Sequence, residues 1–120
     1  MEKPAELPVA CDLNALTSAE RGRHRSLVGA LALAIVGRTE LVDGFELRVD
    51  PTKLELPLLA EWIALERRCC PFLHFRIELA PGAGGATVAL TGGDGVKDFL
   101  RAEMGFPKHF GLAARASVRE

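Results

Sequence analysis

The chain contains no tyrosine, one tryptophan and only three cysteines, and its charges nearly cancel, with 15 Lys and Arg against 16 Asp and Glu in 120 residues. Without tyrosine, the chain lacks one common catalytic phenol and a side chain that is enriched in adaptable binding loops. It also lacks an excess of positive charge and any interleaving of basic and aromatic residues, which are the features of nucleic-acid-binding proteins. We therefore expect no nucleic-acid partner.

Long hydrophobic runs are absent as well. The longest, Leu27–Gly37 (LVGALALAIVG), is too short to cross a bilayer. The N-terminal stretch MEKPAELPVACDL carries prolines and glutamates where a signal peptide needs an apolar segment. We therefore expect a cytoplasmic chain without a membrane partner. In a reducing compartment, an odd number of cysteines predicts free thiols.

Three helices are predicted from hydrophobic periodicity and end signals. The segment TSAE (residues 17–20) matches a capping box, so a helix should run from residue 18 to about residue 36, where Gly37 would end it. A second helix should begin near Leu56 and end by Cys70, because Pro71 disfavours helical backbone in the residue before it. A third helix is expected at about residues 95–104.

Two hairpins are predicted between these helices. Asp43-Gly44 lies between alternating apolar and polar residues and predicts a type I′ turn. Phe45, Leu47 and Val49 should then point to one face of the sheet. The order α-ββ-α-ββ-α predicts a single α+β domain, a two-layer sandwich with an antiparallel sheet of about four strands and the helices on one face. We expect an extended arm at 1–15, a core at 16–104 and a tail at 105–120.

The adjacent cysteines of ERRCCPF (residues 66–72) lie at the end of the second helix. On a helical wheel, Cys69 and Cys70 fall on the buried face with Glu66 at its centre, while Arg67 and Arg68 point outward. His24 lies within the apolar stripe of the first helix. If the two helices pack antiparallel, the end of the second approaches the start of the first. Cys11 precedes that start by only a few residues.

These side chains predict a site for a thiophilic metal or metalloid ion. The candidate ligands are Cys11, His24, Glu66, Cys69 and Cys70. Thiolates with an imidazole or carboxylate suit zinc, copper(I), mercury or a trivalent metalloid. Adjacent cysteines are poor joint ligands for tetrahedral zinc, and the spacing matches no standard zinc finger. Ions of low coordination number fit such a pair better.

Other interpretations of the same residues remain open. The cysteines can be core packing, since free cysteine is among the most buried residue types. A redox or nucleophilic enzyme is disfavoured, because the pair is not a CxxC motif and a helix C-terminus raises the pKa of a thiol. Glu66 and His24 can instead act as acid and base in a small-molecule enzyme, or the domain can form a homodimer. Overall, we favour a binding domain that is not an enzyme.

Several stretches of the chain resemble a small bacterial domain of uncharacterised function. They are residues 20–24 (ERGRH), DGFELR, AEWIALERRCCPFLHFRIEL and LTGGDGVKDFL. Similar stretches occur in free-standing proteins and at the C-terminal end of regulators like the mercury-responsive MerR family. The resemblance implies an association with heavy-metal or stress sensing, with Cys11, Cys69 and Cys70 at the matching thiol positions. This chain carries no helix-turn-helix segment.

Overall fold

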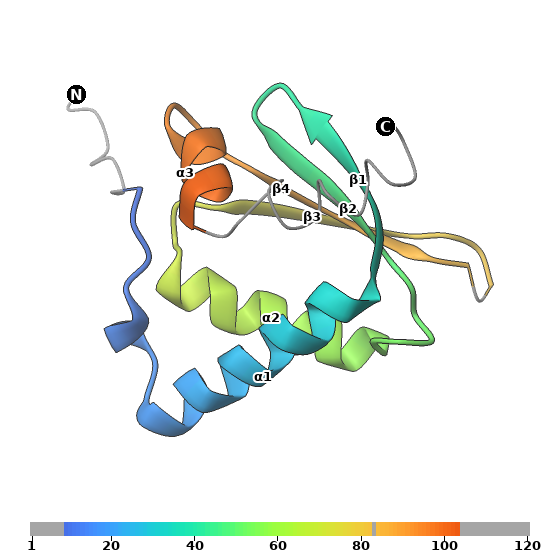
Figure 1. Ribbon diagram of the computed structural model, residues 1–120, viewed down its shortest axis with the longest axis horizontal. Coiled ribbons are helices and arrows are strands. Elements are labelled where there is room, and N and C mark those ends of the chain that lie inside the picture. Colours follow the sequence, from blue (N-terminus) through green and yellow to red (C-terminus); the bar gives the residue numbers. More distant parts are fainter. Residues whose placement is uncertain (1–8, 83, 104–120) are drawn as a thin grey trace, which may run out of the picture.

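The computed structural model describes residues 9–82 and 84–103 and has a layer of helices packed on a four-stranded antiparallel sheet (Figure 1). The elements are the 3₁₀ helix η1 (Leu13–Ala15), α1 (Ser18–Ala34), β1 (Ile35–Leu41), β2 (Gly44–Val49), α2 (Leu56–Cys69), β3 (His74–Leu79), β4 (Ala86–Thr91) and α3 (Val96–Glu103). This order confirms the predicted α+β sandwich. The predicted tail at 105–120 and most of the arm at 1–15 lie outside the described residues. No described helix combines the length and the apolar character needed to span a bilayer.

The sheet buries one face against the helices. Its strand order is β1-β2-β4-β3, and every neighbouring pair is antiparallel. Phe45, Leu47 and Val49 on β2 are at most 1% exposed, which confirms the predicted inward face. At the C-terminal end of the described chain, α3 adds to the cover over Phe45, with Lys97 and Arg101 lying over its ring.

The first hairpin is present, but its turn differs from the prediction. Leu41 pairs with Gly44, so the turn residues are Val42 and Asp43, and neither has a positive φ. The predicted type I′ turn at Asp43-Gly44 is therefore wrong. Gly44 belongs to β2, and a Cβ atom there would lie 1.9 Å from the carbonyl oxygen of Leu90 on β4. The close approach of the neighbouring strand, rather than the turn, requires glycine at this position.

The first helix begins as predicted and ends earlier. Both hydrogen bonds of the capping box are formed between Thr17 and Glu20. The helix ends at Ala34 rather than near residue 36, and Gly37 lies within β1. The amide of Asp50 donates to the carbonyl of Ala34 (2.8 Å), which turns the chain directly into pairing with β2. Sheet pairing thus ends the helix before its glycine.

The first two helices pack antiparallel, as expected (Figure 1). Arg23 of α1 pairs with Glu61 of α2 at 2.7 Å, and Glu20 of α1 pairs with Arg68 of α2 at 2.7 Å. As the residue number rises along α1, the number of the paired residue on α2 falls, so the two helices run antiparallel. The start of α1 therefore lies beside the end of α2, where the predicted site residues are found.

Candidate metal centre

All five predicted ligands lie together at the C-terminal end of α2. They come from three segments, because Cys11 precedes η1, His24 lies on α1, and Glu66, Cys69 and Cys70 are on α2 or cap it. Their donor atoms form two overlapping groups, within each of which all atoms lie within 4.8 Å of one another. The groups are Cys11, Glu66 and Cys70, and His24, Glu66 and Cys69. The wheel positions and the antiparallel packing thus bring these side chains together.

Two of the three cysteines are oxidised in this structure. Cys11 and Cys70 form a disulfide with their Cα atoms 4.4 Å apart, and Cys69 is the remaining free cysteine. The expectation of free thiols is therefore wrong for Cys11 and Cys70. The sequence separation of 59 residues gives no sign of this pairing. It depends on how the N-terminal segment lies across the end of α2.

The segment around Cys11 is also attached by other contacts. The amide of Asp12 donates to the carbonyl of Cys69 (2.6 Å). The Arg68 guanidinium donates to the last carbonyl of η1 (3.0 Å), and Arg21 donates to the carbonyl of Leu16 (2.8 Å), whose side chain is buried. Contrary to the expected extended arm, this part of the chain is folded against α2. Cys11 therefore has a defined place that does not depend on its disulfide alone.

Glu66 lies at the centre of the cluster and is 1% exposed. One carboxylate oxygen, Oε1, is 2.5 Å from His24 Nε2, and the other, Oε2, is 3.4 Å from Cys70 Sγ. A buried carboxylate without partners is costly, so the contact with His24 offsets the loss of hydration. In the disulfide, the Cys70 sulfur has no proton to donate. In the reduced chain, its thiol can donate to Oε2.

The free thiol of Cys69 is fully buried beside this carboxylate. Its sulfur lies 3.8 Å from Cys70 Sγ and 3.7 Å from the carbonyl oxygen of Glu66. Burial raises the pKa of the Cys69 thiol to about 11, and the charge of Glu66 contributes to the increase. The sequence predicted this direction from the helix dipole, whereas in the structure the largest cause is burial. A reactive nucleophile at Cys69 is accordingly disfavoured.

We expect Cys69 to resist alkylation in the folded, oxidised chain. At neutral pH, a thiol with a pKa of about 11 is almost entirely protonated, and its side chain is also inaccessible. Iodoacetamide followed by mass spectrometry should show almost no adduct on the native chain, and one adduct per chain in denaturant without reductant. Rapid labelling of the native chain would contradict this burial.

Arg68 was expected to be a solvated neighbour, but it connects the helices and the N-terminal segment. Its guanidinium donates to Glu20 (2.7 Å) as well as to η1. The hydrogen bond from Arg68, followed by that from the amide of Thr17, lowers the pKa of Glu20 to about 2. The arginines of ERRCCPF gave no sign of this role, because the partner is 48 residues away.

This lowered pKa predicts a pH-dependent contribution to stability. The folded-state pKa of Glu20 is below its ordinary value of 4.5, so the stabilisation is complete above pH 4.5 and is lost as the pH falls towards 2. A Glu20→Gln variant keeps a side chain suited to the capping box and loses the charge. Urea denaturation measures the difference in unfolding free energy between the parent chain and this variant. We expect this difference to decrease as the pH falls from 4.5 to 2. A deficit independent of pH would show that the charge of Glu20 contributes nothing.

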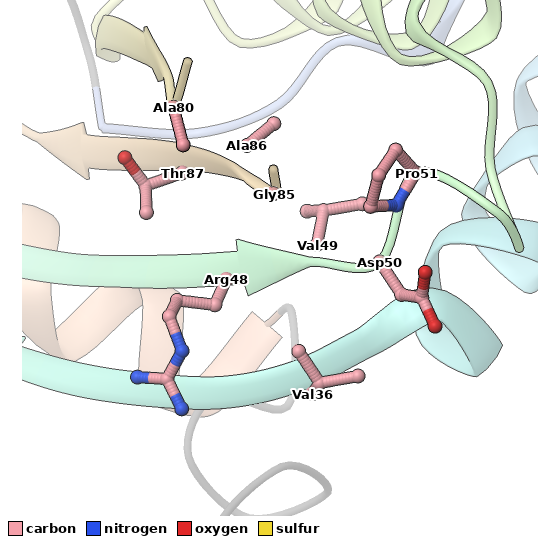
Figure 2. A pocket seen from close by; sticks show the side chains of 9 residues that line it. All are labelled: Val36, Arg48, Val49, Asp50, Pro51, Ala80, Gly85, Ala86 and Thr87. Atoms are coloured by element: carbon pink, nitrogen blue, oxygen red, sulfur yellow. The ribbon is translucent and has the colours of Figure 1, made fainter. Parts of the chain in front are cut away.

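A surface cavity of about 410 Å³ lies away from the cluster (Figure 2). It is formed by the ends of β1 and β2, the following Asp50-Pro51 and the β3–β4 connection, and none of its lining residues is a predicted ligand. Figure 2 shows mostly small and apolar side chains around it, with Arg48 and Asp50 as the charged members. The carboxylate of Asp50 is already bonded to Thr52. This cavity therefore provides no substrate space beside Glu66.

Comparisons with family models, with curated proteins and with solved structures find no match for this chain. The geometry of the cluster is therefore the basis of the function proposed below.

Proposed function

We propose that this chain binds a thiophilic metal or metalloid ion through its cysteine cluster when the cysteines are reduced, and that it acts in sensing or sequestering that ion. The observation that carries the proposal is the pair of overlapping donor groups that share Glu66 and draw on three separate segments. Sulfur, imidazole nitrogen and carboxylate oxygen together are the donors of soft and borderline ions. All donors come from one chain, so the proposed site does not require the homodimer.

The spacing of the adjacent cysteines supports this proposal. Two thiolates bound at about 2.3 Å to one tetrahedral zinc lie about 3.8 Å apart. The sulfur atoms of Cys69 and Cys70 are 3.8 Å apart. The sequence argument that adjacent cysteines suit zinc poorly is therefore weakened, since the turn from helix to cap brings both sulfurs to one side. Zinc and cadmium are thus suitable probes together with a trivalent arsenical.

The oxidation state decides how many sulfurs are available. In the disulfide form, Cys11 and Cys70 cannot bind as thiolates, which leaves Cys69 with His24 and Glu66. Reduction provides three thiols. The proposed function therefore belongs to a reducing environment, in agreement with the cytoplasmic location expected from the sequence.

The acid–base enzyme has less support from the geometry. The Glu66 carboxylate is buried, and it already forms a hydrogen bond with the imidazole of His24. A substrate would have to displace this contact. We therefore do not propose catalysis at this pair.

Native mass spectrometry of the reduced chain with cadmium or zinc tests the proposal. We expect one ion per chain, with uptake lost in Cys69→Ser and Cys70→Ser, because thiolates supply most of the affinity. Glu66→Gln should weaken uptake, whereas Glu61→Gln, an exposed carboxylate on the same helix, should leave it unchanged. Unchanged stoichiometry in both cysteine variants would overturn the proposal.

A further inference from the structure

The two sulfurs of the disulfide differ in their accessibility. Cys11 is an exposed residue, whereas Cys70 is 0% exposed and its sulfur contacts the side chains of Glu66 and Cys69. Thiol–disulfide exchange requires an attacking thiolate to reach one of the two sulfurs. In the folded chain, a reagent from solvent can approach only the Cys11 side without opening the core.

We propose that Cys11 is the site at which a small-molecule thiol opens the disulfide, becoming for a time a mixed disulfide with that thiol. The attacking thiolate forms a bond to Cys11 Sγ as the bond between Cys11 and Cys70 breaks. The electron pair leaves with the Cys70 sulfur, which takes up a proton in place of the one that the small thiol lost. A second small thiol then attacks the mixed disulfide, which releases the Cys11 thiol and a small-molecule disulfide.

The surroundings of Cys70 suit the leaving sulfur. Once protonated, the Cys70 thiol can donate to Glu66 Oε2, which lies 3.4 Å from Cys70 Sγ, so a polar group released in the core has a partner. Cys69 cannot replace the small thiol, because its attack on either sulfur would only move the disulfide within the chain and would leave the oxidation state of the chain unchanged. The reductant must therefore come from solvent.

The N-terminal segment remains in place during this exchange. The bond from Asp12 to Cys69 and the bonds from Arg68 and Arg21 do not involve either disulfide sulfur. Reduction thus leaves the chain with three thiols that are already close together. If the chain binds an ion as proposed above, the disulfide prevents this binding until it is reduced. The site of thiol attack at Cys11 does not depend on the proposed function.

Mapping the adduct tests the position of attack. The oxidised chain is treated with one equivalent of glutathione, quenched with acid, digested with trypsin without reductant and analysed by mass spectrometry. We expect the glutathione adduct on the peptide of Cys11, at least about 10-fold in excess over the peptide of Cys69 and Cys70, because burial protects the latter. An adduct mainly on the second peptide, or no adduct together with an unreduced chain, would overturn the proposal.

Paired variants give a second measurement that does not depend on trapping. Cys69→Ser/Cys70→Ser leaves only Cys11, and Cys11→Ser/Cys69→Ser leaves only Cys70. With a small aromatic disulfide reagent, the Cys70 thiol should react about 100-fold more slowly than that of Cys11, because it becomes reachable only on local opening. In denaturant, the two rates should become similar. Similar rates in the folded chains, checked by circular dichroism, would contradict the proposal.

The two proposals can fail separately. Labelling at Cys11 in a chain whose reduced form takes up no cadmium would remove the proposed function and keep the site of thiol attack. Cadmium uptake by a reduced chain whose adduct lies on Cys70 would do the reverse.

Discussion

Reducing the disulfide between Cys11 and Cys70 is expected to lower the free energy of unfolding by about 4 kcal/mol. The bond links residues 59 positions apart and so closes a large loop in the unfolded chain. Its main effect is to limit the conformations of that unfolded chain, and the loss grows slowly with loop length. A domain of this size is usually stable by about 5–15 kcal/mol, so the reduced chain should stay folded. Urea denaturation with and without a phosphine reductant measures the difference.

Variants separate this effect from the burial of the cysteines. Cys11→Ser should have nearly the stability of the reduced parent chain, and reductant should not change it further. Cys69→Ser should keep the full response to reductant, since Cys69 takes no part in the bond. If the parent chain were equally stable with and without reductant, the disulfide would not restrict the unfolded chain, which would contradict the prediction.

The convergence of the site residues could be inferred from sequence because it depends on regular geometry. Helical periodicity places Glu66 and His24 on inward faces, and the order of the elements requires α1 and α2 to run antiparallel. Those two facts suffice to bring His24 beside Glu66, and the structure has them 2.5 Å apart. Regular elements have few arrangements, so their buried faces can be matched before the structure is known.

The features that sequence reasoning missed depend on irregular backbone and on long-range contacts. The N-terminal segment has no periodicity, so the sequence places Cys11 near the start of α1 but does not predict its disulfide with Cys70. Gly44 looks like a turn glycine, yet its requirement comes from the neighbouring strand β4, which is distant in sequence. Likewise, the outward position of Arg68 on the wheel conceals its contact with η1. Each of these features depends on a contact between segments that are distant in sequence, which a local sequence pattern does not reveal.

The substitution His24→Ala is expected to lower the free energy of unfolding by about 3 kcal/mol. The variant leaves the carboxylate of Glu66 buried without its imidazole partner, and that loss is much larger than the loss of an exposed contact. Arg23→Ala is the matched control on the same pair of helices. The bond from Arg23 to Glu61 is exposed, so its loss should cost much less than the loss of His24. Similar losses in both variants would contradict the dependence of the buried Glu66 carboxylate on His24.

The double variant His24→Leu/Glu66→Leu distinguishes stability from function at the same position. Replacing both members of a buried polar pair by apolar residues is often neutral or stabilising, so the double variant should recover most of what His24→Ala loses. If it also loses cadmium uptake in the reduced state, the chain retains a polar pair that its stability does not need. A role of His24 and Glu66 in binding an ion would then explain their place beside the three cysteines better than a role in folding. A double variant as unstable as His24→Ala would instead assign the pair to the fold.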